Sequence, residues 1–456
     1  MPRNLAKKAA KQQSRIAALN ALGTPASSRA ASEDEDDLDV GSEASFGTVD
    51  STSLLDESTL EDELRRAVDD LGEKRTSTRE TALTKINRLL ANHFCGSIFE
   101  ANASRQEALL QLLVRSLRKP GTAQEAILAA RGIGLTFISE GDIEAGEIED
   151  LFGMVLKLLK NSINTSTDPQ LKCQCIETLA MVTFIAASTS DTCGGMDYFY
   201  NILVTEGECI QPDDKLSQND MNPLLYASLR AYGLLYASIY GDARGSWEDA
   251  FDESQGVMPA HLDLLQSGSK DIRVAAGENV ALMFECVNVT KRMFDQDVED
   301  EDEEEMPEYG EMDELRDMLQ RLATDSNRRV NKQDRKEQKS AFRDIVRTVE
   351  DGTRPNQKLK IGGRALYFRG WAKIIELAAF RNFLGSGLAR HMQDNELLAG
   401  VFGSGRNLQV PPDSESSSSE EEAGQLDIDL EADRGFSQSV VSKRERARKI
   451  KMDKRR

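Results

Sequence analysis

Apolar residues along much of the chain recur at intervals of three and four positions. Clear examples are Leu60, Leu64, Val68 and Leu71, then Leu83, Ile86 and Leu90, and then Ile272, Ala276, Val280 and Phe284. Such spacing places apolar side chains on one face of an α-helix, whereas the alternation typical of strands is almost absent. The one exception is the segment 358–368, whose pattern predicts a short β-hairpin. Its alternating apolar residues are Leu359, Ile361, Leu366 and Phe368, on either side of Gly362 and Gly363.

Helix-start signals mark the same region. Four pairs have the spacing of a capping box, in which each side chain satisfies a free backbone N–H of the other residue. They are Ser58 with Glu61, Ser77 with Glu80, Ser104 with Glu107, and Thr122 with Glu125. Two more helix starts are expected at Asp168 and Asn222, because each precedes a proline that suits the first helical position.

These starts recur along the chain. The second helix of each expected pair begins near Ser77, Thr122, Asp168, Asn222 and Ser269, at intervals of 45, 46, 54 and 47 residues. Armadillo and HEAT repeats have a period of about 40–47 residues. We therefore predict an all-α fold, an armadillo/HEAT-like helical solenoid, in which Gly132 and Gly134 serve close helix packing. An irregular helical domain with chance spacing is the alternative.

Composition shifts suggest the boundaries. We expect a disordered N-terminal segment at 1–53, an armadillo-like helical repeat domain at 54–294, and an acidic loop at 295–310. A smaller helical C-terminal domain containing the hairpin follows at 311–405. An acidic, Ser-rich linker at 406–436, which includes PPDSESSSSEEE, leads to a basic tail at 437–456. The termini are expected to be disordered because they have few apolar groups to bury.

Charge is distributed unevenly. The net charge is -21, but residues 1–31 carry six Lys/Arg and no acid, and residues 443–456 carry nine Lys/Arg and two acids. The acidic middle favours solubility, whereas the basic ends indicate partners of their own.

Catalytic and metal-binding patterns are missing. The three histidines, His93, His261 and His391, fall on separate predicted segments. The cysteines lack the spacing of a zinc site, and the acidic run 295–305 has Asp300 where a calcium loop needs glycine. We therefore expect no enzyme activity, no metal, no cofactor and no small-molecule substrate. The longest apolar stretch, 178–187, is too short for a membrane span, so we expect a reducing, intracellular location and no membrane partner.

The basic tail is the first candidate binding element. Its cations are Lys443, Arg444, Arg446, Arg448, Lys449, Lys451, Lys454, Arg455 and Arg456. A helix of this length is marginal in water, so we expect it to order on a polyanion, where each neutralised phosphate releases a counterion. The absence of aromatic residues favours backbone contact over base stacking. A nuclear localisation signal and a merely solubilising tail are the alternatives.

The second candidate is a basic stripe at three- and four-residue steps. Its members are Arg328, Lys332, Lys336, Lys339, Arg343 and Arg347. On the opposite face Phe342, Ile345, Val346 and Val349 are expected to dock onto the solenoid. An ordinary amphipathic helix with a charged outer face is the alternative.

Several blocks in order resemble the interferon-related developmental regulator family. They are DIRVAAGENVALMFE (271–285), LRDMLQRLATDSN (315–327), QKSAFRDIVRTVE (338–350), LKIGGRALYFRGW (359–371) and FLGSGLARHMQDNELLAGVF (383–402). The resemblance implies an armadillo-like domain without enzymatic activity. It also implies either translational silencing on idle ribosomes, with the C-terminal region entering the particle, or nuclear co-regulation of transcription with corepressors.

From the residues and the resemblance together, we expect a regulator of gene expression whose tail and basic stripe contact ribosomal RNA. A bound tail would exclude tRNA or messenger RNA from an idle ribosome, in the cytoplasm. The alternative is a nuclear co-regulator whose solenoid recruits corepressor proteins and whose tail directs import.

Overall fold

The computed structural model describes residues 56–100, 103–139, 145–211, 217–241, 245–296, 309–324, 332–361 and 364–403. The expected N-terminal segment, linker and basic tail lie outside these ranges, as do residues 297–308 of the expected acidic loop.

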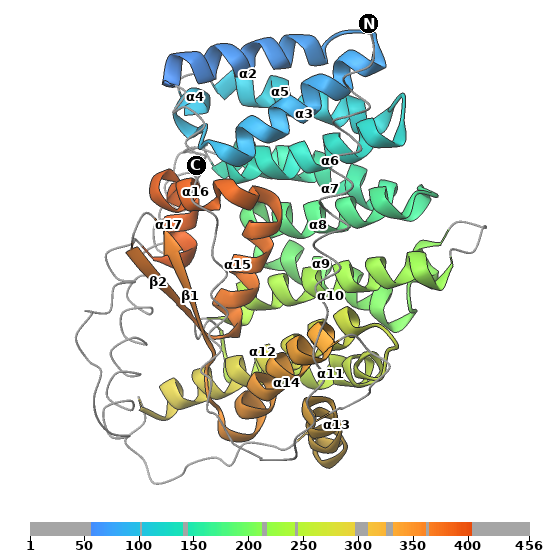
Figure 1. Ribbon diagram of the computed structural model, residues 1–456, viewed down its shortest axis with the longest axis vertical. Helices are drawn as coiled ribbons and strands as arrows, with labels where there is room; N and C mark the ends of the chain where they lie inside the picture. Colours follow the sequence, from blue (N-terminus) through green and yellow to red (C-terminus); the bar gives the residue numbers. More distant parts are fainter. Residues whose placement is uncertain are drawn as a thin grey trace, which may run out of the picture. The chain divides into compact units, whose positions relative to one another are not determined.

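Ten helices form five consecutive pairs (Figure 1). The pairs are α2 (Glu57–Leu71) with α3 (Thr76–Asn92), α5 (Ala103–Arg118) with α6 (Ala123–Ile138), α7 (Ala145–Thr165) with α8 (Pro169–Ala186), α9 (Thr189–Val204) with α10 (Gln218–Tyr240), and α11 (Trp247–Leu265) with α12 (Lys270–Gln296). Each second helix packs on its own partner and on the second helix of the next pair. The predicted all-α solenoid is confirmed.

Shorter elements and a C-terminal group of helices complete the described fold. Helix α4 (Gly96–Glu100) connects the first two pairs, and the 3-10 turn η1 (Glu208–Ile210) lies between the two helices of the fourth pair. After the fifth pair come α13 (Met312–Thr324), α14 (Lys332–Asp351), β1 (Asn356–Ile361), β2 (Arg364–Arg369), α15 (Trp371–Leu384), η3 (Gly385–Gly387), α16 (Leu388–Asp394) and α17 (Glu396–Phe402). None of the described helices combines the length and hydropathy that crossing a bilayer requires.

The spacing of the repeats is more regular than the sequence indicated. The second helices begin 46 to 52 residues apart. The predicted start at Asn222 is wrong, because Ser217 caps α10 by accepting a hydrogen bond from the Asp220 N–H at 3.3 Å. Pro223 therefore lies inside the helix. The helix therefore begins at the Ser217 cap, five residues before Asn222, and not at the proline.

Two of the other expected caps are confirmed and three are wrong. Thr122 and Asp168 each accept hydrogen bonds from the first turn of the following helix. Ser58 and Ser77 instead lie inside α2 and α3, which begin earlier and have no side-chain cap. Ser104 lies inside α5, which begins at Ala103.

Half of the predicted Thr122–Glu125 capping box is confirmed, because Thr122 accepts the Glu125 N–H at 3.1 Å. The Glu125 carboxylate has a different role from the expected one. It accepts the Gly121 N–H at 2.8 Å and forms a buried ion pair with Arg79 of α3, with Nε 2.6 Å from Oε1. The side chain predicted to close one helix start therefore also joins the first two repeats.

One linkage between second helices occurs twice. Asn87 of α3 donates its side-chain N–H to the Leu128 carbonyl of α6, and Asn279 of α12 donates to the Leu229 carbonyl of α10, each at 2.9 Å. One turn further along stand Gly132 and Gly233, where a Cβ atom would collide with the same asparagine. The close-packing role expected for Gly132 is confirmed, and the asparagine explains it.

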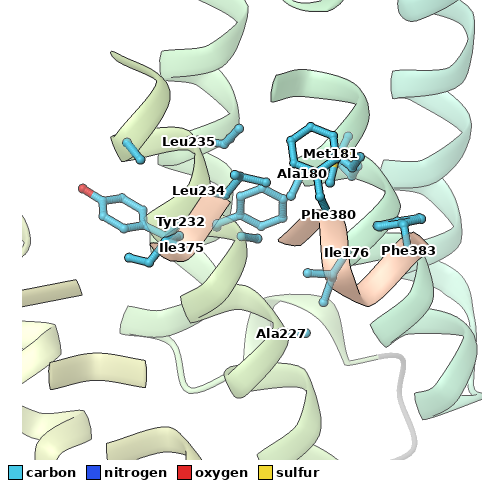
Figure 2. Packing of buried hydrophobic residues seen from close by; sticks show 14 of the residues in the cluster. Ile176, Ala180, Met181, Ala227, Tyr232, Leu234, Leu235, Ile375, Phe380 and Phe383 are labelled. Atoms are coloured by element: carbon cyan, nitrogen blue, oxygen red, sulfur yellow. The ribbon is translucent and has the colours of Figure 1, made fainter. Parts of the chain in front are cut away.

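Helix α15 packs along the row of second helices and contacts α3, α6, α10 and α12. Figure 2 shows Phe380 and Phe383 of α15 among Ile176, Ala180 and Met181 of α8. Gly134 of α6 also makes room for the Phe383 ring, as its expected packing role required. The buried hydrophobic cluster therefore continues from the first repeat into the C-terminal helices. The boundary expected at 295–310 stays a prediction.

The predicted hairpin is confirmed. Strands β1 and β2 are antiparallel, with Leu359 opposite Leu366. The four apolar residues predicted for it are all buried. The Phe368 ring stands edge-on to the Phe402 ring of α17, with centroids 5.3 Å apart, so one face of the hairpin belongs to the core.

Candidate nucleic-acid interface

The structure describes only part of the predicted binding set. The nine tail cations within 443–456 and Arg328 lie outside the described residues. Lys332 is the first residue of α14, and its side chain is not among those described. Lys336, Lys339 and Arg343 lie on α14, together with Arg347. The geometry of the candidate interface therefore comes from this helix.

Apolar packing fixes the orientation of α14. Phe342 and Ile345 are fully buried and Val349 nearly so, and the helix lies against α12 and α13. At Gly277 of α12, an added Cβ would stand 2.8 Å from Ile345 Cδ1 and 3.0 Å from Phe342 Cε1. The predicted docking of this face onto the solenoid is confirmed, and a missing side chain on α12 permits the close approach.

The opposite face of α14 is cationic. Lys336, Arg343 and Arg347 are exposed and Lys339 is half-buried. No ion pair joins any of these four to another described residue. Their charges are therefore available to an external anion.

Two acids of the same helix, Asp334 and Glu337, pair with a lysine of α12. Lys270 of α12 lies 2.9 Å from the Asp334 carboxylate and 2.8 Å from the Glu337 carboxylate. Hydrogen bonds to these two acids raise the pKa of Lys270, and the Glu337 pKa is lowered in return. Burial raises the pKa of the Asp344 carboxyl despite the nearby Arg347 and Arg343, and the exposed Glu350 carboxylate accepts a hydrogen bond from the Gln320 side chain of α13 at 2.8 Å. The docking contacts therefore pair two of the acids of α14 with a cation of α12.

A buried polar junction holds the end of α14 to the elements around it. The Glu285 carboxylate of α12 accepts the Trp371 N–H at 2.9 Å and stands 3.7 Å from Arg354 Nε. The Trp371 indole N–H donates to Thr348 Oγ1 at 2.8 Å, and that hydroxyl donates to the Thr353 carbonyl. This junction ties α12, α14, the segment before β1 and the start of α15 together.

Sequence reasoning missed this junction. Periodicity assigns roles to apolar residues, and a glutamate on a helix is usually solvent-exposed. One signal was present, since Glu285 is the only charged residue in the apolar run VALMFECVNV at 280–289. An acid in such a run requires a buried partner.

The histidines have structural partners. His391 Nε2 lies 3.1 Å from the Leu90 carbonyl and His261 Nδ1 lies 3.0 Å from the Val257 carbonyl, so each of these nitrogens carries the proton. Burial lowers the pKa of both rings to about 4. Although the sequence places them on separate segments, His93 and His391 come together where Arg390 contacts His93. Burial and Arg390 lower the pKa of His93.

Two buried thiols and one half-buried thiol give no sign of a nucleophile. Burial raises the pKa of Cys95, Cys173 and Cys175 to about 12, which keeps each of them protonated. In the part of the chain that the structure describes, no three His, Cys, Asp or Glu side chains gather in a way that could hold a metal ion.

Comparison with known proteins shows the family to which this helical architecture belongs. Residues 23–350 match the family model described as interferon-related developmental regulator (IFRD). The chain is 30% identical over 348 residues to interferon-related developmental regulator 2 of Mus musculus, covering 76% of this chain and 73% of that protein. It is 29% identical over 368 residues to interferon-related developmental regulator 1 of Homo sapiens, covering 79% and 76%.

An uncharacterised protein of Schizosaccharomyces pombe is 25% identical over 378 residues, with 81% of this chain and 79% of that protein covered. The matched family range ends within α14, so the hairpin and α15 to α17 follow it. With most of the chain matched, and with the helical repeats in place, the chain belongs to the interferon-related developmental regulator family.

Proposed function

We propose that this regulator binds idle ribosomes through ribosomal RNA and represses translation without catalysing a reaction. The observation that carries the proposal is the cationic face of α14, with Lys336, Arg343 and Arg347 exposed. Because the opposite face is anchored in the core, these side chains stand on a rigid support. Backbone phosphates are the natural ligand of such a face.

Local charge supports an RNA partner despite the acidic chain. Residues 328–369 contain thirteen Lys/Arg and five Asp/Glu, whereas the whole chain has a net charge of -21. Exposed charges further apart than about 8 Å are largely screened at physiological salt, so a phosphate at this face interacts mainly with the local cations. The acidic remainder is repelled by RNA and favours a single docking orientation.

The proposed mechanism is occupancy. The α14 face anchors the protein on ribosomal RNA, and the basic residues of 443–456 extend into a site used by tRNA or messenger RNA. Both are electrostatic contacts, so binding weakens steeply as salt concentration rises. Ribosomes engaged in translation are not bound because those sites are already filled.

Sedimentation of lysate on a sucrose gradient, with and without starvation, tests the proposal. Co-migration with single ribosomes but not polysomes is expected. K336Q/R343Q/R347Q should weaken binding and lower the slope of log affinity against log salt by about 2. Deletion of 443–456 should also weaken it. The matched control is K74Q/R118Q/K119Q, three exposed cations at the α2–α3 and α5–α6 turns.

If both the triple variant and the deletion co-sediment like the parent at physiological salt, the proposal is refuted. Confinement of the wild-type protein to light fractions under both conditions would favour the nuclear co-regulator. In that case corepressors must bind outside the row of second helices where α15 packs.

A further inference from the structure

The outer face of the β1–β2 hairpin carries basic and aromatic side chains. Residues alternate between the two faces of a strand, so the buried Leu359, Leu366 and Phe368 leave a second face turned outward. On that face Lys358 stands opposite Tyr367, and Asn356 stands opposite Arg369. Figure 1 shows the hairpin beside α15 and α17, which cover its apolar side.

The charged residues of the hairpin and its flanking segments are all basic. Residues 352–371 contain five Lys/Arg and no Asp or Glu. Lys358 is exposed, and its ammonium nitrogen lies 5.5 Å from the centre of the half-buried Tyr367 ring. The hairpin therefore presents an aromatic ring next to a cation, and neither strand contains an acidic residue.

The hairpin is also firmly placed relative to the cationic face of α14. The Gly370 N–H donates to the Pro355 carbonyl at 2.7 Å, which closes the base of the hairpin, and the Thr353 N–H donates to the Arg347 carbonyl at 3.4 Å. The Glu285–Arg354 ion pair fixes the same connection to α12. The basic face of α14 thus leads into the hairpin through a hydrogen-bonded turn.

We propose that this hairpin face binds single-stranded RNA, with one base stacked on Tyr367 and a flanking phosphate neutralised by Lys358. Stacking needs an aromatic ring and tolerates any base, whereas cations track the backbone. A duplex would hide its bases and leave Tyr367 without a stacking partner. The basic tail and the α14 face lack exposed aromatic residues, so the hairpin adds a distinct mode of contact. The proposal rests on the proposed function in taking RNA as the partner.

Binding of the purified full-length protein to a labelled single-stranded RNA of about 12 nucleotides, followed by fluorescence anisotropy, tests the proposal. Y367L should weaken binding by about 10-fold, because it keeps an apolar side chain and removes the stacking ring. Y367F should bind like the parent because its ring is retained. K358Q should weaken binding and lower the salt slope by about 0.7. The matched charge control is K119Q on the exposed α5–α6 turn, which should bind like the parent.

Two results would overturn the proposal. One is that Y367L and K358Q both bind the oligonucleotide like the parent. The other is that the wild-type protein prefers an RNA duplex of equal length. K358Q keeps the test valid if Y367L proves unstable, because the Lys358 side chain is exposed and outside the core.

Ribosome co-sedimentation of the same variants separates this proposal from the proposed function. If the wild-type protein co-sediments but the hairpin variants bind the oligonucleotide normally, the hairpin proposal alone fails. If the wild-type protein does not co-sediment but Y367L and K358Q lose oligonucleotide binding, the ribosome proposal alone fails.

Discussion

Replacing Glu285 by alanine should release the end of the hairpin and the start of α15 from the solenoid. Glu285 is 5% exposed, and its carboxylate accepts the Trp371 N–H at 2.9 Å. Its other oxygen lies 3.7 Å from Arg354 Nε, and the Arg354 side chain is 14% exposed. The substitution therefore removes a charged acceptor from a buried backbone N–H and a counter-charge from a largely buried guanidinium.

The loss of the hydrogen bond and the loss of the ion pair together determine how far E285A lowers the free energy of unfolding. A hydrogen bond to a charged acceptor contributes about 1.5–3 kcal/mol. The ion pair, at this distance and with some solvent access at Arg354, adds about 1 kcal/mol. We expect E285A to lower the free energy of unfolding by about 2.5–4 kcal/mol. E285Q retains an oxygen for the Trp371 N–H and loses the charge, so about 1 kcal/mol is expected for it.

Tryptophan fluorescence can report on the junction directly, because the chain has two tryptophans and Trp371 lies within it. In a W247F background, urea unfolding followed by Trp371 emission should show a lower midpoint for E285A than for E285Q. E61A, at an exposed ion pair on α2, is the control and should stay within about 0.5 kcal/mol of the parent. An E285A variant within about 1 kcal/mol of the parent would refute this account of the junction.

Two further predictions concern packing and pH. G134V should lower the free energy of unfolding by about 1–3 kcal/mol, because its side chain enters the space of the Phe383 ring. G153A, which meets nothing within 4 Å on α7, should instead stabilise by about 0.5–1 kcal/mol, and equal urea midpoints for the two would contradict the packing argument. His261 and His391 have folded pKa values of about 4, below the ordinary 6.5, so the unfolded chain binds more protons between these limits. Stability should therefore fall as pH drops from 6.5 towards 4, by up to about 1.4 kcal/mol per pH unit for each histidine, and H391Q should remove one histidine's share of that slope. Equal slopes for H391Q and the parent, measured by urea unfolding across this range, would count against burial of a neutral His391.

The periodicity of apolar residues predicted the helices and the hairpin, and the intervals between helix-start signals predicted the repeats. A helix or strand buries one face, so the identity of the buried residues follows from local spacing alone. For the same reason the amphipathic character of α14, with Phe342 and Ile345 on one side and Lys336 and Arg343 on the other, was predictable before its position was known. Helix starts were less certain, because several side chains near a terminus compete to cap it, as Ser217 did with Asn222.

Tertiary structure alone decided which distant residues meet. The packing of α15 on the row of second helices, the Asn87–Gly132 and Asn279–Gly233 contacts, and the Glu285 junction join residues between 45 and more than 200 positions apart. No local pattern encodes such pairings, because each depends on the angle and distance between helices already packed. The pairing of acids on α14 has the same origin. The sequence determined that both acids and bases lie on that helix, and docking beside Lys270 determined that Asp334 and Glu337 pair with a cation of α12.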